Sequence, residues 1–506
     1  MKIVDRKKVA IIGAGVSGLA AAKAFAEKGH EIHGFERGPD FGGVWEASVS
    51  YPNVRTQSDK DLYAFSDMPM PDDYPQWPSG AQVQKYLTNY ARKHDVAHAF
   101  SFNTKVLSVD QGDDGWTVEV EHPPKGKAKP KRETLKFDFV AVCVGQYSNP
   151  KRLNAPGESD FTKAGGQIIH SSQYVDDALA AGKNVVVVGA SKSGTDVAVN
   201  AWKAGAKQVT LVYRRDVWRM PYKVLGLLNF KHLVFMRLQE HFSKPWGKSG
   251  FGKVVGKLTK PLAWANYRGL EMVLRAQLGL KKFDMLPTEG IENQVACAFP
   301  IVTPDFFTGI EIGKIKPVRT EVARYNEGSV TLKNGETVEA DLVVEAIGWE
   351  RDVPFLSPSV KAKLVGPQGD YRLFRHAVNP DLPGLGFVGF NSSFATMLTS
   401  EMVAHWLVRF ADDQLAKQPD AATMKAEIAA LEKWRHEERT ASLPDKGLCV
   451  APFHFLHFDE LLADMGARKR KSLNPLVEYL SYPRLRNIRA YLESTPAYSA
   501  ERRADA

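Results

Sequence analysis

A glycine-rich stretch near the start of the chain, Gly13-Ala14-Gly15-Val16-Ser17-Gly18, has the spacing of a dinucleotide-binding loop. Glycines allow a pyrophosphate to approach backbone N–H groups, and the positive end of a following helix attracts the phosphates. Glu36 stands 21 residues after Gly15. A carboxylate there can accept hydrogen bonds from both ribose hydroxyls and would repel a 2′-phosphate. The first motif therefore predicts a site for FAD or NAD rather than NADP.

A second motif of the same shape, Gly189-Ala190-Ser191-Lys192-Ser193-Gly194, has serine in place of the middle glycine. A serine hydroxyl can itself bond a phosphate. Where the first motif has its acidic residue, this half has Arg214 and Arg215. Guanidinium groups at that place can clamp a 2′-phosphate, so we predict a site for NADPH. The alternative is that both arginines are only exposed charges at the end of a strand.

Two dinucleotide sites of opposite charge character describe a flavoprotein that NADPH reduces, with hydride passing from the nicotinamide to the flavin N5 atom. The three cysteines, Cys143, Cys297 and Cys449, are widely separated and form no CxxC pair. This argues against the disulfide reductases, which share the plan of two nucleotide sites. The spacing predicts no disulfide and favours a reducing cytoplasm.

Each motif must sit between a strand and a helix to work. The expected elements are a strand, a helix and a strand at 9–12, 19–28 and 32–36, and again at 184–188, 195–203 and 208–213. This repeat predicts an α/β fold with two Rossmann-type domains. Alternating residues at 116–120 and 134–137, and the Asn334-Gly335 turn after 329–332, predict β-hairpins.

The expected FAD-binding domain is discontinuous, residues 1–155 plus 315–415. The NADPH-binding domain spans 156–314 and carries a helical insertion at about 223–283. A charged, helical C-terminal extension, 416–506, is expected to wrap the outside. The insertion mixes leucine and aromatic residues with many lysines and arginines. It is expected to form a lid and tunnel wall over the active site; the alternative is an interfacial face that touches a membrane.

The composition is that of an ordinary globular enzyme, with 506 residues, 44% hydrophobic residues and a net charge of +9. There is no signal-peptide layout and no long apolar run, which favours a soluble, cytoplasmic protein, with peripheral membrane contact as the alternative. Basic clusters at 125–132 and 468–471 are expected to be solvated loops. No pattern of a nucleic-acid-binding module occurs, so nucleic acid is not an expected partner.

Beyond the glycine motifs, four stretches carry a resemblance to the flavin-containing monooxygenases and their Baeyer–Villiger relatives, over about residues 5–410. Phe41-Gly42-Gly43-Val44-Trp45 resembles the family's loop beside the flavin, and Tyr51 to Pro71 resembles the segment that lines the isoalloxazine. Gly166 to Tyr174 matches most of the family fingerprint, and Glu345 to Trp349 stands where the family has its Ala-Thr-Gly linker. Three departures occur: Ala164 replaces the fingerprint phenylalanine (Phe161 is the candidate substitute), Gln57 replaces an active-site asparagine, and Ile347 replaces threonine. Tyr174 closes the fingerprint as in the flavin-containing monooxygenases, where Baeyer–Villiger enzymes have tryptophan.

The resemblance implies an FAD- and NADPH-dependent monooxygenase in which reduced flavin and O2 form a C4a-(hydro)peroxyflavin. Oxygen transfer to sulfur or nitrogen of a small lipophilic substrate ranks first. The alternatives are Baeyer–Villiger oxidation of ketones to esters or lactones, and an NADPH-dependent flavin reductase or oxidase without oxygen transfer. A homodimer is a further expected partner.

The resemblance and the two motifs together give a set of site residues. Gln57 and Thr56 are the candidate catalytic residues, with Gln57 either bonding the peroxide or nicotinamide ribose or only packing under the flavin. The residues expected at the first site are Gly13, Gly15, Ser17, Gly18, Glu36, Arg37, Gly43, Val44, Trp45, Arg55, Gln57, Ser58, Val106 and Gly145. Those expected at the second are Gly189, Ser191, Lys192, Ser193, Gly194, Thr195, Arg214 and Arg215.

Two groups of histidines are expected to be structural. His170 is predicted to be a hydrogen-bonded residue between domains rather than a proton shuttle. His454, His457, Asp459 and Glu460 have a spacing compatible with metal ligands, but the stretch is aromatic and helical and we predict no metal site.

Overall fold

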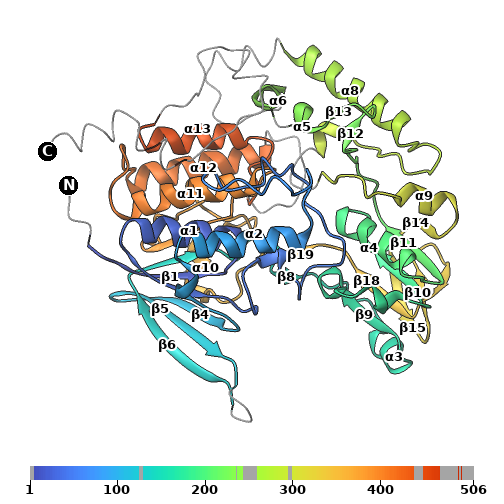
Figure 1. The fold of residues 1–506 in the computed structure, drawn as a ribbon, viewed down its shortest axis with the longest axis horizontal. Helices are drawn as coiled ribbons and strands as arrows, with labels where there is room; N and C mark the ends of the chain where they lie inside the picture. The colour runs from blue at the N-terminus through green and yellow to red at the C-terminus, as the bar shows by residue number, and fades with distance from the viewer. Residues whose placement is uncertain are drawn as a thin grey trace.

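The structure is a computed structural model that describes residues 5–124, 129–234, 236–242, 259–294, 299–437 and 448–467, with Ile488 and Leu492. Two units, each with its own parallel sheet, lie side by side in Figure 1, the first mainly blue and orange, the second green and yellow. The basic cluster at 468–471, part of that at 125–132 and the middle of the insertion lie outside the described residues. The predicted α/β class is confirmed.

The first unit is built on a five-stranded parallel sheet of order β20-β7-β1-β2-β3. Its strands are β1 (Lys8–Ile12), β2 (Glu31–Phe35), β3 (Phe100–Ser101), β7 (Phe139–Val142) and β20 (Leu385–Phe387). Helix α1 (Val16–Glu27) connects β1 to β2. The apolar residues of β1 and β7 are buried because helices and a second layer of strands cover both faces of the sheet.

The second unit has the same plan, with a parallel sheet of order β14-β11-β10-β18-β9. Its strands are β9 (Gln167–His170), β10 (Asn184–Val188), β11 (Gln208–Tyr213), β14 (Ile315–Arg319) and β18 (Leu342–Glu345), and helix α4 (Lys192–Lys203) connects β10 to β11. In each unit the strand before the glycine loop is central. The ligand crevice of such a sheet lies at the carboxyl ends of its strands.

The internal repeat extends further than the two βαβ segments. A three-stranded antiparallel meander, β4 (Lys105–Gly112), β5 (Gly115–His122) and β6 (Lys131–Phe137), precedes β7. A second one, β15 (Val322–Asn326), β16 (Ser329–Leu332) and β17 (Thr337–Glu339), precedes β18. The hairpin of 116–120 and 134–137 is therefore confirmed, as is the turn at Asn334-Gly335, but the strand that follows this turn is 337–339 and not the predicted 340–346, which contributes β18 to the parallel sheet. The predicted return to the first domain at residue 315 is wrong, because β14 and β18 pair within the second sheet.

The chain crosses between the units at a two-stranded antiparallel ribbon of β8 (Asn149–Pro150) and β19 (Trp349–Glu350), which lies between the two sheets in Figure 1. Beside it, Arg152 Nε lies 2.9 Å from Oε2 of Glu345, whose side chain is fully buried. The outgoing and returning segments are thus joined by backbone pairing and by an ion pair.

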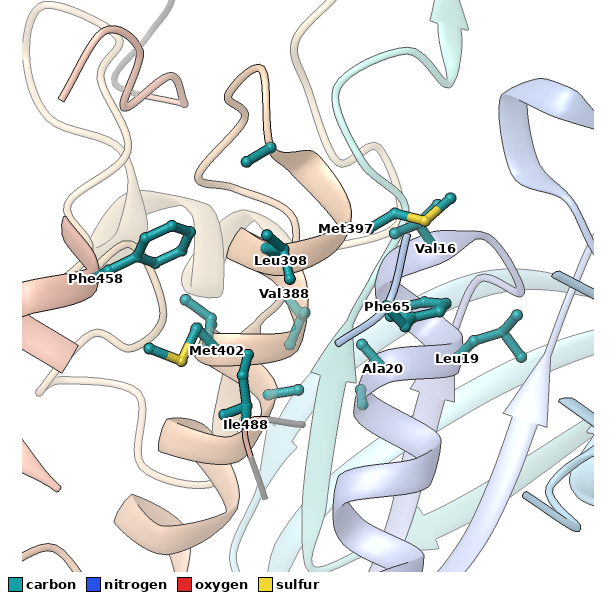
Figure 2. Close-up of a cluster of buried hydrophobic side chains, with 14 of the residues drawn as sticks. Val16, Leu19, Ala20, Phe65, Val388, Met397, Leu398, Met402, Phe458 and Ile488 are labelled. Carbon is teal, nitrogen blue, oxygen red and sulfur yellow. The ribbon is translucent and has the colours of Figure 1, made fainter. Parts of the chain in front are cut away.

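The core of the first unit is formed where α1 packs against α11 (Thr396–Ala411). Figure 2 shows Val16 of α1 next to Met397 of α11, with Met402 on the side of α11 that is turned towards Phe458. Helix α11 is buried on every side, from Met397 to Arg409. The remaining helices are α2 (Gly80–Lys93), α3 (Glu158–Lys163), α9 (Phe306–Glu311) and α10 (Pro358–Leu364), with short 3-10 turns at Gly43–Trp45, Ala97–Ala99, Ser171–Gln173, Asp177–Ala180 and Ile291–Asn293.

The insertion is mainly helical where the structure describes it, as predicted. It begins with a hairpin of β12 (Lys223–Val224) and β13 (Leu228–Asn229), followed by α5 (Lys231–Val234), α6 (Arg237–Phe242) and, after a gap in the description, α8 (Lys260–Gln277). The end of α8 holds the hairpin, since Gln277 Oε1 accepts from the backbone N–H of Leu225 at 2.9 Å and its Nε2 donates to the carbonyl oxygen of Lys223 at 2.8 Å.

The C-terminal extension is helical where it is described, with α12 (Ala421–Glu437) and α13 (His454–Asp464). The expectation that it wraps the outside is wrong for α13, because Phe455, Phe458, Leu461 and Leu462 are buried against the core. The start of α13 is held by the insertion. Glu240 of α6 accepts from the backbone N–H groups of Phe455 and Leu456 at 2.6 and 3.1 Å.

Cys449, which precedes α13, is disulfide-bonded, whereas Cys143 is free and buried. The prediction of no disulfide, made from spacing alone, is therefore wrong for Cys449. Among the residues that the structure describes, no helix is both long and apolar enough to span a bilayer.

Candidate functional site

The first glycine loop joins β1 to α1 in a turn that only glycine fits. Gly13 has φ +105° and its N–H donates to the carbonyl oxygen of Phe35 at 2.8 Å. A Cβ on Gly18 would lie 1.8 Å from the carbonyl oxygen of Gly13. The N-cap of α1 is Gly15, which has no side chain to bond the first N–H groups, unlike Ser79, which caps α2. Those N–H groups are therefore available to an anion.

The second glycine loop has the same backbone geometry as the first. Gly189 has φ +108°, and its N–H donates to the carbonyl oxygen of Val212 at 2.8 Å. A Cβ on Gly194 would lie 1.8 Å from the carbonyl oxygen of Gly189. Ser191, the N-cap of α4, makes no side-chain capping bond. Both loops therefore offer the same backbone cradle for a pyrophosphate.

Two further features complete the cradle at the first loop. Gly15 and Gly43 face each other so closely that a Cβ on Gly43 would lie 3.1 Å from Gly15 Cα. The Glu36 carboxylate, at the end of β2, accepts from the N–H of Ala14 and of Gly38, both at 2.7 Å. Glu36 is thus fixed beside the loop, where ribose hydroxyls of a dinucleotide would lie. These features fit a bound dinucleotide with two free ribose hydroxyls.

The other residues predicted for the first site have different surroundings. The Ser17 hydroxyl lies 3.1 Å from that of Ser400, and the Val106 side chain packs in the buried face of β4, so their contact with a cofactor stays a prediction. Gly145 follows β7 in open space with φ +65°. The remaining contacts are Arg37 to the carbonyl oxygen of Ser148, Arg55 to that of Trp77, Ser58 to that of Phe394 and Trp45 to the hydroxyl of Tyr63. Val44 is exposed.

The two candidate catalytic residues lie where the two units meet. Thr56 is fully buried, and its hydroxyl has no hydrogen-bond partner among the residues that the structure describes. Gln57 is exposed, and its Oε1 accepts from the backbone N–H of Ile301 at 3.1 Å, which leaves its amide N–H groups for other partners. A buried hydroxyl without a partner costs free energy, so Thr56 fits a site that a bound polar group completes.

The predicted NADPH residues form two groups. Arg214 and Arg215, beyond the end of β11, are exposed; Arg215 lies 3.8 Å from the exposed carboxylate of Glu289. Lys192, by contrast, is mostly buried and donates to Asp196 Oδ1 at 2.6 Å. Ser193 is half-buried, and Thr195 is buried with its hydroxyl 2.7 Å from that of Thr303.

Sequence reasoning missed two residues of the second site. Arg219 is buried and donates to the carbonyl oxygen of Ala190, within the glycine loop, at 2.5 Å, and burial lowers its pKa to about 10. Asp196 joins α4 to the first unit, as described below. A local signal was present, since Lys192, Asp196 and Asn200 recur every fourth residue on one face of α4.

The fingerprint residues are structural. His170 is buried; its Nδ1 accepts from the N–H of Ser172 at 3.2 Å, so Nε2 carries the proton and donates to the carbonyl oxygen of Gly348 at 3.1 Å. This bond ties the fingerprint to the linker that follows β18. Burial lowers the pKa of His170. Phe161 fills the place that Ala164 leaves, with its ring against Gly166.

The four residues around α13 with metal-ligand spacing have other surroundings. Asp459 forms a bidentate pair with Arg237 at 2.6 and 3.1 Å, and His457 Nε2 lies 3.0 Å from Asn391 Nδ2. Burial lowers the pKa of His454 to about 3, so its imidazole is neutral. Within the described residues no cluster of three metal-binding side chains occurs.

The Phe65–Pro69 segment beside the first loop is anchored by Glu401 of α11. Glu401 accepts from the N–H and the hydroxyl of Ser66 at 2.8 and 2.7 Å, and burial raises its pKa to about 7. The raised pKa means that the fold favours the protonated form of Glu401. The contribution of Glu401 to the stability of the fold is therefore complete below about pH 4.5 and is lost as the pH rises through about 7. Between these two pH values, we expect the free energy of unfolding of the wild type to fall by up to about 3 kcal/mol relative to that of Glu401→Gln. Urea unfolding of both proteins at pH 5 and pH 8 measures it; a gap independent of pH would contradict the assignment.

The family described as "Flavin-binding monooxygenase-like" (FMO-like) matches residues 6–473. A relative from Arabidopsis thaliana, "Probable flavin-containing monooxygenase 1", is 29% identical, covering 94% of both chains. Among solved structures, S-allyl-L-cysteine S-oxygenase from Allium sativum has a TM-score of 0.61 at 20% identity and covers 99% of both chains. An oxidized steroid monooxygenase bound to NADP has a TM-score of 0.65 at 17% identity and covers 91% of this chain and 98% of its own.

The two structures share the fold of this chain, and the family match spans most of its length, including both glycine loops. The backbone cradles, the fixed carboxylate at the first loop and the exposed arginines at the second fit the two cofactors of such enzymes. The chain belongs to the flavin-binding monooxygenase-like family, and it is a flavin-dependent monooxygenase whose cofactors are FAD and NADPH.

Proposed function

We propose that the enzyme transfers one oxygen atom from O2 to the sulfur or nitrogen of a small lipophilic molecule, with FAD in the first loop and NADPH in the second. The balanced reaction consumes NADPH, a proton and O2 and yields NADP+, water and the S- or N-oxide. When bound, the reduced flavin supplies the electrons that activate O2. The residues of the chain position the two cofactors and set the charge around the reacting atoms.

The observation that carries this proposal is the charge state of the contact between the units. Gln57 is uncharged, and Lys192, the cation of the second loop, is neutralised by Asp196 at 2.6 Å. Arg55 donates to the carbonyl oxygen of Trp77 at 3.1 Å. An oxygen donor that attacks a ketone is an anion, which an unpaired cation would stabilise, whereas one that a sulfur or nitrogen atom attacks is neutral. The uncharged Gln57 and the paired Lys192 therefore favour S- or N-oxygenation, whereas Arg55, which keeps its charge beside a carbonyl oxygen, is the residue that would favour Baeyer–Villiger chemistry.

An aromatic wall beside Gln57 supports a lipophilic substrate. Trp77 packs on Tyr222 and Phe230 from the base of the insertion, with ring centroids 4.5 and 6.4 Å apart. Met220 pairs through its backbone with Ile301, the residue that Gln57 contacts. The insertion thus forms a wall of the site, and apolar walls of this kind bind apolar ligands.

The test is a panel of a thioether, a tertiary amine and a cyclic ketone, each incubated with NADPH and air. We expect a gain of one oxygen atom in the thioether or the amine by mass, with little hydrogen peroxide. A lactone from the ketone alone would overturn the choice of substrate. Hydrogen peroxide in the same amount as the NADPH consumed, with every substrate unchanged, would instead indicate a reductase or oxidase.

Arg214 and Arg215 are proposed to select NADPH over NADH. Both are exposed at the end of β11, where a 2′-phosphate would lie. Replacing both with alanine is expected to raise the KM for NADPH at least tenfold, about 1.4 kcal/mol, and to change the KM for NADH less. Steady-state kinetics with both nucleotides measures the difference, and equal losses would count against this role.

We also propose that the outer face of the insertion contacts an anionic membrane surface. Five of its apolar side chains are 61–87% exposed: Leu225, Leu227, Leu262, Trp264 and Met272. The exposed lysines Lys223, Lys260 and Lys281 lie on or beside the same elements, which suits an acidic headgroup layer.

The membrane proposal is tested by co-sedimentation with vesicles of neutral or acidic phospholipid. We expect binding to the acidic vesicles, lost in a Leu227→Glu/Trp264→Glu variant and kept in Ile312→Glu, whose isoleucine is also exposed but lies on the second unit. The other expected partner of this face is a second copy of the chain. If the wild type does not bind lipid, and light scattering gives the double variant half the mass of the wild type, the face would instead be the interface of a homodimer.

A further inference from the structure

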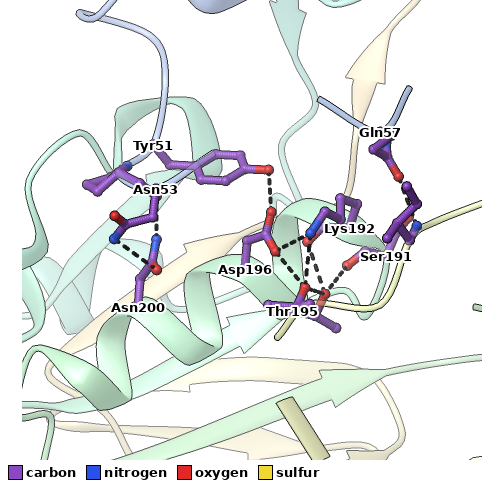
Figure 3. Close-up of polar contacts among 11 residues, drawn as sticks. Tyr51, Asn53, Gln57, Ser191, Lys192, Thr195, Asp196 and Asn200 are labelled. Carbon is purple, nitrogen blue, oxygen red and sulfur yellow. Dashed lines mark hydrogen bonds and ion pairs between the residues drawn. The ribbon is translucent and has the colours of Figure 1, made fainter. Parts of the chain in front are cut away.

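Asp196, on the face of α4 that meets the first unit, receives three hydrogen bonds from three parts of the chain. Its Oδ2 accepts from the hydroxyl of Tyr51 at 2.9 Å, and its Oδ1 accepts from Lys192 at 2.6 Å and Thr303 at 2.5 Å. Figure 3 shows the Tyr51 and Lys192 side chains converging on this carboxylate from opposite sides. Only 7% of Asp196 is exposed. A carboxylate so buried is stable only while its donors stay in place.

A second contact lies one helical turn further along α4. Asn200 Nδ2 donates to the carbonyl oxygen of Pro52 at 2.6 Å, and Asn53 Nδ2 donates to Asn200 Oδ1 at 3.4 Å. The Tyr51 ring also packs against the core of the second unit. Residues 51–53, which belong to the first unit, are therefore seated on α4 of the second unit, and Asp196 is the charged centre of that contact (Figure 3).

The contact lies between the two cofactor sites. Lys192 begins α4, directly after the second glycine loop, and Gln57 follows Tyr51 by six residues and bonds Ile301, near Thr303 in sequence. A dinucleotide on the second loop runs across the carboxyl ends of β10 and β18, beside this contact. We propose that Asp196 is a positioning residue that, through Tyr51, fixes the second unit in the orientation that brings the nicotinamide of NADPH to the flavin. The proposal rests on the assignment of FAD and NADPH to the two loops and not on the choice of substrate.

The simpler explanation is that Asp196 only neutralises Lys192, four residues before it on the same helix. The two explanations differ at Tyr51, since Tyr51→Phe removes the hydrogen bond that joins Asp196 to the first unit and leaves the Lys192–Asp196 pair intact. Tyr325→Phe is the matched control. Its hydroxyl also donates to a buried carboxylate, Glu345 Oε1 at 3.2 Å, but both residues lie within the second unit.

The first measurement is the rate of flavin reduction by NADPH without oxygen, together with the dissociation constant of NADP+. For Tyr51→Phe we expect the reduction rate to fall at least tenfold while NADP+ affinity changes less than twofold, because the loop that binds the phosphates is untouched. Tyr325→Phe is expected to reduce its flavin at the wild-type rate. A Tyr51→Phe reduction rate within twofold of wild type would overturn the proposal.

The second measurement needs no turnover. Hydrogen–deuterium exchange of the FAD-loaded protein is expected to rise in peptides covering 51–57 and the start of α4 in Tyr51→Phe, and to stay unchanged there in Tyr325→Phe. In a cycle with Asp196→Ala, the double variant is expected to reduce flavin no more slowly than Asp196→Ala alone. Multiplied losses, or unchanged exchange at 51–57, would show that Tyr51 does not act through Asp196. If Asp196→Ala does not fold, the comparison of the two tyrosine variants decides.

Discussion

Gly18→Ala is expected to give a protein that folds but purifies without flavin. The new Cβ would lie 1.8 Å from the carbonyl oxygen of Gly13, far below the distance that real contacts allow. The loop must therefore open, and the N–H groups at the start of α1 lose the alignment that holds a pyrophosphate. The ratio of flavin absorbance to protein, measured after purification and again after incubation with FAD, gives the result.

The repeat supplies the control for this prediction. Gly194→Ala places a Cβ at the same 1.8 Å from the equivalent carbonyl oxygen, that of Gly189. That protein is expected to keep its flavin and to lose reduction by NADPH, while dithionite still reduces it. Gly269→Ala, on α8 with open space around its Cα, is expected to keep both properties. A Gly18→Ala protein with a full complement of FAD would show that the first loop does not hold the flavin.

Arg152→Ala is expected to lower the free energy of unfolding strongly, although the Arg152 side chain is partly exposed. Glu345 is fully buried, and Arg152 is its ionic partner at 2.9 Å. Removing one partner of such a pair leaves a buried charge, at a cost of about 3 kcal/mol; the partial exposure of Arg152 keeps the loss at the lower end of the usual range. Thermal unfolding at pH 7 measures it.

Two further observations would separate this charge effect from simple loss of packing. Burial raises the pKa of Glu345, so acid neutralises it readily, and the gap between Arg152→Ala and wild type is expected to narrow as the pH falls. Glu345→Gln added to Arg152→Ala is expected to recover part of the loss, because a neutral amide needs no cation. A gap that stays constant from pH 7 to pH 5 would contradict the charge explanation.

The sequence predicted those parts of the fold that short-range patterns encode. Both βαβ segments follow from glycine spacing and apolar runs, and one turn or hairpin of each meander follows from alternation and turn residues. Which sheet a strand joins is a long-range property, and this is why β14 and β18 were placed in the wrong unit. The meander that precedes β7 recurs before β18, and reading that repeat would have corrected the boundary. The burial of α13 was missed because the charge of the surrounding tail hid its apolar face.

In the candidate site, too, some residues could be predicted from the local sequence and others could not. Residues whose role depends on backbone geometry, such as Gly13 and Gly189, could be assigned from local sequence. Side-chain direction could not, so the contact of the Ser17 hydroxyl with that of Ser400 was not predicted. Asp196 was overlooked because its principal partners, Tyr51 and Thr303, are more than a hundred residues away. Contacts of that range depend on how the two units dock, which no local pattern encodes.

The ribbon of β8 and β19 brings residues 150 and 349 next to each other in adjacent strands. The chain therefore leaves the first unit and returns to it at the same place, and the segment between residues 150 and 349 is connected to that unit by two adjacent strands. Because the two ends of this segment are adjacent, the segment could be replaced by a short linker or by a domain from another protein without stretching the chain. Grafting the equivalent segment of a relative at these two positions is a direct route to exchanging nicotinamide preference while the flavin-holding unit stays the same.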